Sequence, residues 1–524
     1  MRLNIKDTFS KQLPADSDTS NNPRQVHHAC FSYVTPQSPE NPKLLHASSE
    51  VAELLGITEA DLSTPDFLGL VTGSQILEGT KPYAMCYGGH QFGNWAGQLG
   101  DGRAINLTEL EHANKRWAIQ LKGSGLTPYS RTADGLAVLR SSIREHLCSE
   151  AMHYLGVPTT RSLSLSLSGS EVMRDVLYNG NAAMEKGAIV ARVAPIFIRF
   201  GNFEIFASRG EFETLKQLTD FTIQEYFPGI ASGTKEGYVA FLQEVANRTL
   251  EMIVHWQRVG FVHGVMNTDN LSILGLTIDY GPYGWLEGYD PNWTPNTTDK
   301  QFKRYRFGNQ AKVAHWNLYQ LANALYSFID ESEPLEAILD SFNKDYQIQY
   351  LEMMRHKLGL QKGVDGDQEL ISKLEKTLQL TETDMTIFFR LLGTISLKSD
   401  ALNSEKVLDI IKEAFYAPQE LKEEVLSSWN SWISNYLARL NQEDISDTDR
   451  QTAMNKTNPK YVLRNYMAQL VIDDAEKGDV TLLNEIFELL KNPYEEQVTQ
   501  EKWFAKRPEW ARNKVGCSML SCSS

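Results

Sequence analysis

The sequence predicts an α+β fold of two lobes, in which a β-rich lobe precedes a helical one. Between Tyr83 and Gly125 glycines are dense, and the segments 103–107 and 117–122 alternate apolar and polar residues as strands do. From about residue 211 onward, apolar residues recur instead at helical spacing. With 524 residues, 42% of them hydrophobic, the chain is able to bury a large core.

Changes in pattern divide the chain into four segments. Residues 1–75 form a mixed, partly polar extension with a short helical pattern at 49–55, which we expect to wrap a neighbouring domain. Residues 76–200 form the β-rich lobe, 201–430 the helical lobe, and 431–524 a helical extension with a cysteine-containing tail. Within the β-rich lobe we expect a helix at 137–155 and a strand at 188–193. Helical spacing later in the chain covers 235–259, 311–331, 334–358, 368–393, 404–416, 419–440 and 460–476.

Composition narrows the function classes. A formal charge of −15 argues against a general nucleic-acid binder, which needs a basic face for backbone phosphates. The chain shows neither a signal-peptide core at its start nor a run of about 18 apolar residues, so we expect no membrane contact and a cytoplasmic location. The five cysteines are too few and scattered for a disulfide framework or a zinc site. We expect a monomer.

The stretch from His263 to Asn270 carries the strongest functional signal. Protein kinases use a loop of the form His-Gly/Arg-Asp-x-x-x-x-Asn and then Asp-Phe-Gly, whose Asn and second Asp hold metal on nucleotide phosphates. Here Asn270 and Asp279 keep the metal-binding half, but Val265 stands in the place of the catalytic Asp and cannot accept a proton. Asp269 is the remaining candidate for a general base. The order of the lobes is also that of kinases, so a protein-kinase-like bilobal fold is predicted.

A phosphate-binding half is predicted upstream of this loop. The Gly-rich segment Gly97–Arg103 lies between two expected strands, where glycines let backbone N–H groups approach a phosphate. Lys122 ends the second strand, as does the kinase lysine that pairs with nucleotide phosphates. Glu145 and Glu150 on the next helix are both candidates for its carboxylate partner, and periodicity does not decide between them.

Two arginines stand in the apolar segment ARVAPIFIRF. If Arg192 and Arg199 point inward they need an anionic partner, and a polyphosphate would supply one. The alternative is strand alternation that places each of them in solvent. Their occurrence together with Lys122 and Arg103 favours the phosphate-binding interpretation.

Several long strings resemble the selenoprotein O family, in its bacterial, cysteine-containing form. The resemblance runs from about Tyr83 to the last residue. The strings are YGGHQFGNWAGQLGDGRA, QLKGSGLTPYSRTADGLAVLRSSIREHLCSEAMHYLGVPTTRSLSL, RVAPIFIRFGNFE, GFVHGVMNTDNLSILGLTIDYGPYGWL, NPKYVLRNYMAQ and the terminal CSS.

The resemblance implies a pseudokinase that works as a protein adenylyltransferase. ATP would be bound in the reverse of the kinase orientation, with Mg²⁺ or Mn²⁺, so that its α-phosphorus faces a protein hydroxyl. AMP would pass to Ser, Thr or Tyr of other proteins or of the chain itself, and pyrophosphate would leave. The absence of a kinase base at Val265 agrees with this activity.

The resemblance also implies residue roles. The catalytic group would comprise an ion pair of Lys122 with Glu145 and the proton acceptor Asp269. The metal would be held by Asn270 and Asp279. Nucleotide contacts would come from Gly100, Gly102, Arg103, Asp134, Gly135, Arg192 and Arg199.

Two other functions stay open from the residues alone. In the first, the chain is a protein kinase that transfers the γ-phosphate with Asp269 as base. In the second, it is a non-catalytic nucleotide- or redox-sensing protein that binds partners through its acidic surface and cysteine tail. Cys517 and Cys522 lie in that polar tail, where exposure would permit redox chemistry.

Overall fold

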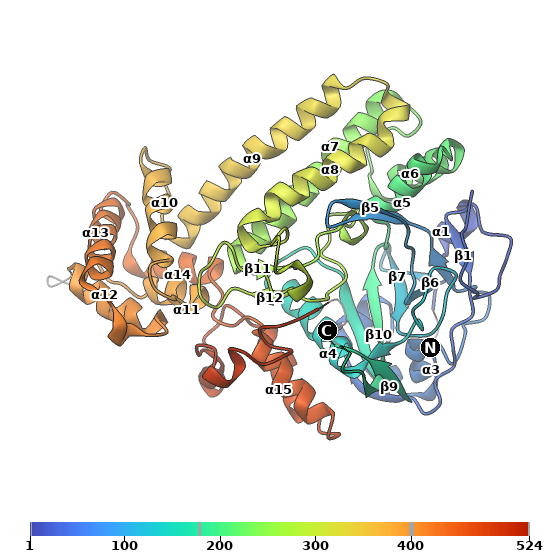
Figure 1. Ribbon diagram of the computed structural model, residues 1–524, viewed down its shortest axis with the longest axis horizontal. Coiled ribbons are helices and arrows are strands. Elements are labelled where there is room, and N and C mark those ends of the chain that lie inside the picture. The colour runs from blue at the N-terminus through green and yellow to red at the C-terminus, as the bar shows by residue number, and fades with distance from the viewer. Residues whose placement is uncertain (2, 177–179, 398–402, 522–524) are drawn as a thin grey trace.

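The computed structural model describes residues 1, 3–176, 180–397 and 403–521. An antiparallel sheet occupies the N-terminal half and helices the C-terminal half, which confirms a mixed α+β fold (Figure 1). In the described residues, none of the helices is long and apolar enough to cross a bilayer.

Within the described residues, the main sheet has eight strands in the order β1-β3-β6-β7-β10-β9-β2, with β8 beside β10. Their bounds are β1 Phe31–Tyr33, β2 Lys43–Ala47, β3 Tyr83–Met85, β6 Ala104–His112, β7 Lys115–Lys122, β8 Ala137–Val138, β9 Arg161–Arg174 and β10 Ala183–Ala194. The N-terminal segment therefore contributes the two ends of the strand order, β1 and β2. Where the domains of the chain begin and end stays a prediction.

The register of two central strands places the cationic side chains. Val190 of β10 lies opposite Lys122 of β7, and Arg192 lies opposite Gln120. Because alternate residues of a strand share one face and opposite residues of paired strands do too, Lys122 and Arg192 project from the same face of the sheet.

Two short hairpins stand outside this sheet. β4 (Gly88–Gln91) pairs with β5 (Asn94–Gln98), and β11 (Phe261–Val262) pairs with β12 (Gly284–Trp285). The first arises from the dense glycines expected to join strands. The second frames the loop that carries Asn270 and Asp279.

The α-helices that precede residue 200 cover the sheet. They are α1 Thr8–Gln12, α2 Ser49–Leu54, α3 Pro65–Thr72 and α4 Leu139–Tyr154. The predicted stripe Leu139, Ile143, Leu147 and Ala151 of α4 is fully buried and packs against β9 and β10. A second apolar cluster joins residues of α2 and α3 to β6, β7, β9 and β10. The sheet is therefore covered both by α4 and by α2 with α3.

From residue 200 onward the chain is mainly helical. These helices are α5 Phe200–Arg209, α6 Phe212–Tyr226, α7 Lys235–Val259, α8 Gln310–Ile329, α9 Glu333–Lys357, α10 Asp367–Leu378, α11 Met385–Leu392, α12 Ser404–Ile411, α13 Glu423–Leu440, α14 Asp447–Thr457, α15 Asn465–Ala475 and α16 Thr481–Leu490. Residues 235–259 are confirmed as one helix, and 311–331 and 334–358 each agree with a helix to within two residues.

One helix prediction is wrong. Residues 368–393 form α10 and α11 with a break between them. Asp384 starts a new helix at this point, because its backbone is extended and its carboxylate accepts a hydrogen bond from the Ile387 N–H as the N-cap of α11. The pattern also missed α5, α6, α14 and α16, and it started 460–476 five residues before α15 begins.

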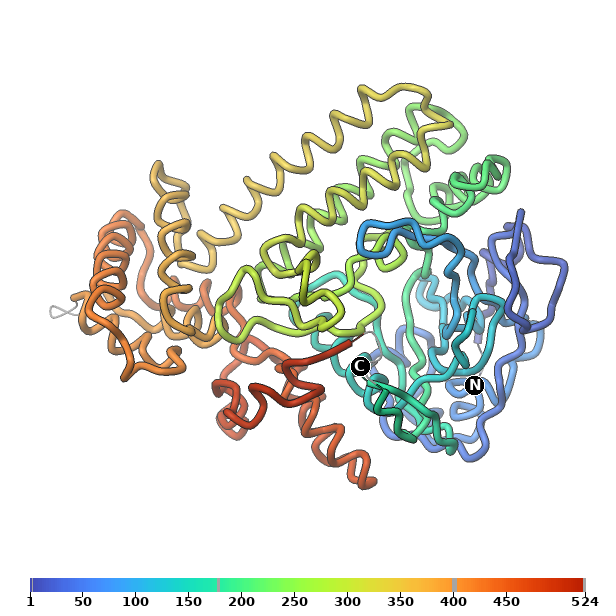
Figure 2. The backbone as a smooth tube through the Cα atoms, viewed as in Figure 1, coloured from blue at the N-terminus to red at the C-terminus, as the bar shows by residue number. Residues whose placement is uncertain are grey.

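The C-terminal segments return to the first half of the chain. α15 and α16 both pack on α4. Leu520 forms an isolated β-bridge with Asn296, whose side-chain amide donates to the Gly264 oxygen in the loop from His263 to Asn270. Figure 2 shows this last segment running back toward the middle of the molecule. The chain's end therefore helps to hold the loops around the candidate site.

Candidate active site

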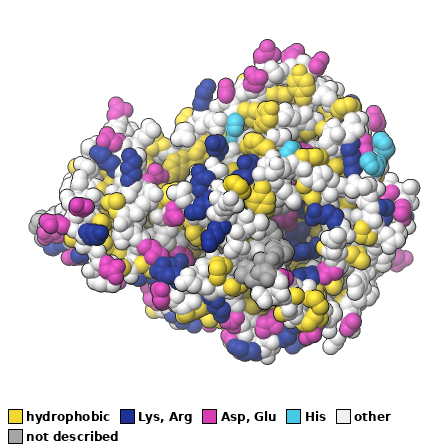
Figure 3. Space-filling model, in the orientation of Figure 1, with side chains coloured by type: hydrophobic (Ala, Val, Ile, Leu, Met, Phe, Trp, Pro, Cys, Tyr) yellow, Lys and Arg dark blue, Asp and Glu magenta, His cyan; other side chains and the backbone are white. Residues whose placement is uncertain are grey.

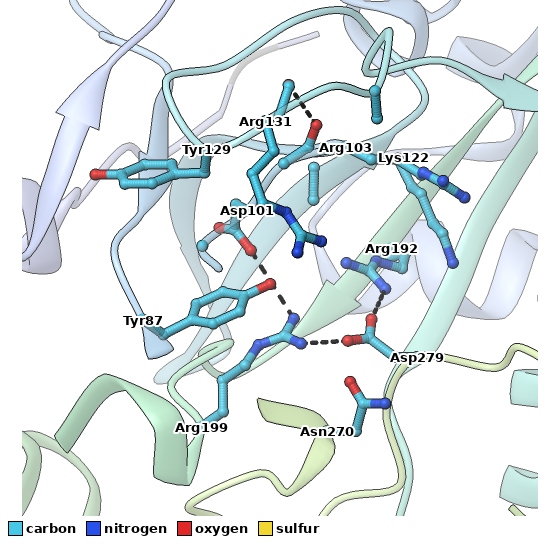
Figure 4. A pocket seen from close by; sticks show the side chains of 15 residues that line it. Tyr87, Asp101, Arg103, Lys122, Tyr129, Arg131, Arg192, Arg199, Asn270 and Asp279 are labelled. Atoms are coloured by element: carbon cyan, nitrogen blue, oxygen red, sulfur yellow. Dashed lines mark hydrogen bonds and ion pairs between the residues drawn. The ribbon is translucent and has the colours of Figure 1, made fainter. Parts of the chain in front are cut away.

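A cavity lies between the sheet and the loops that follow α7 (Figure 4). It gathers cations, glycines and the two candidate metal ligands from segments far apart in the chain. The predicted site residues in its lining are Gly100, Gly102, Arg103, Lys122, Arg192, Arg199, Asn270 and Asp279.

The Gly-rich loop is shaped by close packing on Tyr129. Gly100 has a left-handed φ of 76°, and a Cβ there would lie 2.3 Å from the Tyr129 ring. A Cβ on Gly102 would lie 2.6 Å from the Tyr129 carbonyl oxygen. Between them Asp101 is buried and its Oδ2 accepts a hydrogen bond of 3.0 Å from the Met85 N–H. Only glycine fits these two positions. Asp101 anchors the loop between them and was not among the predicted site residues.

Lys122 contacts Glu145 and not Glu150. The Lys122 ammonium forms an ion pair with Glu145 Oε2, and Glu145 Oε1 accepts from Arg192 at 2.9 Å. Glu150 instead pairs with Arg161 at 2.7 Å. The geometry therefore leaves Glu145 as the carboxylate that orients Lys122.

Asp279 is held by two arginines. Its Oδ1 accepts from Arg192 at 2.6 Å, and its Oδ2 accepts from Arg199. Burial alone would raise the pKa of Asp279, but Arg199 and Arg192 outweigh it and hold that pKa well below the usual range. The residue also has a left-handed φ of 58°, which aims its carboxylate into the cavity from the end of its loop.

Asp269 has the opposite electrostatic environment. Burial raises its pKa to about 7, and Arg199 opposes this only in part. Its Oδ2 accepts from Gln91 Nε2 at 3.4 Å, and its Oδ1 has no hydrogen-bond partner within the described residues. Asp269 does not line the cavity, but its backbone oxygen accepts from Arg199 at 2.8 Å.

The loop from His263 to Asn270 is fixed by hydrogen bonds to backbone oxygens. Val265 is buried, so an apolar side chain fills the position at which a kinase has its base. Its carbonyl oxygen accepts from Asn270 Nδ2 at 3.0 Å, which leaves the Asn270 amide oxygen for the cavity. His263 Nε2 lies 2.8 Å from the Ile278 oxygen and ties the loop to the segment before Asp279.

The β4–β5 hairpin covers this loop, a placement that sequence reasoning missed. His90 N–H donates to Thr268 Oγ1 at 2.7 Å, and a Cβ on Gly89 would lie 2.6 Å from Asp269 Oδ1. The repeated glycines of the hairpin were the available signal, since close backbone approach requires them.

Asp134 and Gly135 do not line the cavity. Asp134 is partly exposed and pairs with Arg174 at 2.6 Å. Gly135 has a left-handed φ of 72° in a turn, where a Cβ would lie 2.1 Å from the Gly125 oxygen. The neighbouring Ala133 does line the cavity. Contact of Asp134 and Gly135 with a nucleotide stays a prediction.

Comparison with known proteins identifies this arrangement. A family model described as Protein adenylyltransferase SelO matches residues 18–491. The chain belongs to the SelO family. Relatives described as Protein nucleotidyltransferase YdiU agree at full length: that of Flavobacterium johnsoniae is 62% identical over 100% of this chain and 99% of its own. That of Rhodopirellula baltica is 53% identical over the same shares, and that of Aromatoleum aromaticum is 51% identical, again over 100% and 99%.

SelO membership makes the chain a protein nucleotidyltransferase, an adenylyltransferase whose nucleotide substrate is ATP. The cavity has the charge that such a substrate needs, because Lys122, Arg192 and Arg199 all reach it. The resemblance of the sequence to selenoprotein O is thereby confirmed.

A divalent cation fits the donors that this SelO chain presents. Asn270 offers an amide oxygen and Asp279 a carboxylate that stays ionised, both suited to a hard cation. Within the described ranges there is no group of three or more His, Cys, Asp or Glu side chains that could hold a metal alone. Nucleotide phosphates and water would then complete the coordination.

The tail differs from the exposed thiol expected of it. Cys517 is 4% exposed, and burial raises the pKa of its thiol to about 11. Its backbone oxygen accepts from Asn465 Nδ2 at 2.7 Å, which holds this part of the tail against α15. A buried neutral thiol is a poor nucleophile. Cys522 lies outside the described residues.

Proposed function

We propose that the chain transfers AMP from ATP to Ser, Thr or Tyr hydroxyls of proteins on a protein-kinase-like bilobal scaffold, with the nucleotide reversed relative to kinases. One observation carries the proposal: three cations surround the phosphate side of the cavity, while Asp269 is the carboxylate in the loop where Val265 takes the place of the kinase base. Such a site can bind a polyphosphate, but it lacks the usual base for γ-phosphate transfer.

The reaction balances with these residues. The acceptor hydroxyl gives its proton to Asp269 as its oxygen bonds to the α-phosphorus. The bond from that phosphorus to the bridging oxygen breaks, and pyrophosphate leaves with the electron pair. Because negative charge develops on this leaving group, cations already in place around it lower the barrier.

Arg192 and Arg199 would supply most of that charge. Both are buried and now contact Asp279. A bound triphosphate would compete for the same guanidiniums and free Asp279 for a metal. Lys122, oriented by Glu145, adds a further cation. Gly100 and Gly102, with Arg103, let the backbone approach the phosphates at the other wall.

Mg²⁺ or Mn²⁺ held by Asn270 and Asp279 would supply charge neutralisation on the phosphate oxygens. Asp269 would be ready to accept a proton near neutral pH, since burial raises its pKa to about 7. The two carboxylates thus divide the work of anchoring and of proton transfer.

Incubation with a divalent metal and ATP labelled at either the α- or the γ-phosphate tests the proposal. The acceptors are the chain itself and a generic protein. We expect protein-bound label only from the α position. Label only from the γ position would show a kinase, and binding of ATP without any labelled protein would show a nucleotide-sensing protein.

We also propose acceptance of AMP by the chain itself, a monomeric state and a cytoplasmic location. The charge of −15 supports the expectation of no nucleic-acid partner. Analytical ultracentrifugation and fractionation of cells test the last two.

A further inference from the structure

A basic segment at residues 300–306 stands out on this acidic chain. The chain has a net charge of −15, yet Lys300, Lys303, Arg304 and Arg306 follow one another closely there. Phe302 among them is 79% exposed. Among the described residues, Arg304 and Arg306 lie close enough to the buried Asp299 carboxylate to oppose the rise that burial causes in its pKa. Lys300 and Lys303 therefore carry the charge that is most available to a partner.

The basic segment has a defined shape. The Asp299 carboxylate is buried and accepts hydrogen bonds from the backbone N–H groups of Arg304 at 2.9 Å and Tyr305 at 2.7 Å. The Arg304 guanidinium lies over the Trp316 ring at 4.6 Å. The buried Asp299 carboxylate therefore fixes the backbone of the turn from inside, while the Lys300 side chain is exposed and that of Lys303 is half-buried.

The basic segment adjoins the acceptor side of the site. Tyr305 OH donates to Asn267 Oδ1 at 2.6 Å and accepts from the Phe92 N–H at 2.9 Å. Asn267 is in the same loop as Asp269, and Phe92 belongs to the hairpin that covers Asp269. A Cβ on Gly93 of this hairpin would lie 3.4 Å from the Arg304 guanidinium carbon.

These cations do not serve the nucleotide cavity, since none of them lines it. Figure 3 shows Lys and Arg side chains gathered in the middle of one face, over the loops around β11 and β12. A positively charged surface near Asp269 favours an acidic partner segment at this place. The rest of this chain, with its net negative charge, would repel such a segment.

We propose that residues 300–306 dock an acidic segment of the acceptor protein and so bring its hydroxyl to Asp269. Phe302 would contact an apolar side chain of that segment. This inference rests on the proposed transfer of AMP to protein hydroxyls and specifies the class of acceptor.

The experiment measures AMP transfer to two synthetic peptides of equal length and the same central hydroxyl residue, one flanked by glutamates and the other by lysines. The variant Lys300→Glu/Lys303→Glu is compared with Lys344→Glu/Lys376→Glu, which changes net charge equally at exposed sites on α9 and α10. Phe302→Ala is compared with Ile348→Ala, a 63% exposed residue of α9.

We expect the wild type to prefer the glutamate-flanked peptide. Lys300→Glu/Lys303→Glu should raise the KM for that peptide about tenfold with little change in kcat or in ATP binding, and should improve use of the lysine-flanked peptide. The charge-matched control should keep the wild-type preference. Phe302→Ala should raise both KM values by a smaller factor.

Equal KM values for the two peptides, or equal losses in the two double variants, would overturn the docking surface while the transfer reaction stands. Absence of α-label transfer by the wild type to any acceptor, with ATP still bound, would instead refute the proposed function. A single-stranded oligonucleotide that binds the wild type but not Lys300→Glu/Lys303→Glu, with unchanged peptide KM, would reassign the basic segment to nucleic acid.

Discussion

The phosphate side and the acceptor side of the site treat the same residue type in opposite ways. Asp279 contacts Arg192 and Arg199, and its pKa is held well below the usual range. Asp269 lies under the β4–β5 hairpin with one long hydrogen bond from Gln91, and burial raises its pKa to about 7. Both carboxylates are buried, so contact with arginines is what keeps Asp279 ionised as an anchor and leaves Asp269 able to accept a proton.

The largest effect should come from removing the anchor. Asp279→Asn keeps the size of the side chain but loses the charge that Arg192, Arg199 and a metal require. We expect AMP transfer to fall by about 10³-fold or more, a loss typical of electrostatic groups at a reaction centre. Transfer of α-label measures it, and Asp330→Asn at the exposed end of α8 is the matched control. Full activity in Asp279→Asn would remove its metal role.

The second prediction concerns the cation opposite that anchor. Lys122→Met should lower kcat/KM for ATP by about 10²-fold, because one charge-assisted contact to the phosphates is lost. Glu145→Gln should weaken ATP binding through Lys122, while Glu150→Gln should lower thermal stability and leave ATP affinity nearly unchanged. Equal losses of ATP affinity in the two glutamate variants would refute the distinction drawn from their contacts.

The third prediction uses the pKa of Asp269. Only the ionised carboxylate accepts a proton, so the rate should fall about tenfold per pH unit below about 7 and level off above it. Asp269→Asn should be slow at every pH and lack this limb. Because the folded-state pKa lies above the unfolded value, Asp269 should also favour the folded state below about pH 4, an advantage lost as the pH rises to about 7.

The profile of kcat against pH is measured at saturating ATP for the wild type and for Asp269→Asn. If the fall in rate below about pH 7 keeps the same midpoint in the variant, it belongs to another group. Thermal melting of the wild type against Asp269→Asn over the same pH range provides an independent readout.

The smallest effect should come from the hairpin. A Cβ on Gly89 would lie 2.6 Å from Asp269 Oδ1, so Gly89→Ala must displace the hairpin or the carboxylate. We expect kcat to fall about tenfold with ATP affinity retained, since misplacing a reacting group costs rate rather than nucleotide binding. The control is Gly281→Ala, because a Cβ there meets no heavy atom within 4 Å and its φ is not left-handed. A kcat equal to that of the wild type in Gly89→Ala would separate the hairpin from catalysis.

Much of this site was predictable from local sequence. Lys122 at a strand end, Arg192 and Arg199 in an apolar segment, and Asn270 followed by Asp279 each carry a short-range signal. The structure brings all five into one cavity. The α+β order was predictable for the same reason, because strand and helix periodicities are local properties of the chain.

The sequence by itself determined the order of the elements, the length of α7 and the inventory of charged groups near the phosphates. Only the tertiary structure decided which glutamate meets Lys122, what covers Asp269, and that Cys517 is buried. The physical reason is that these outcomes depend on contacts between residues far apart in the chain. Periodicity tells which face of an element is apolar, but packing and register decide which partner that face meets.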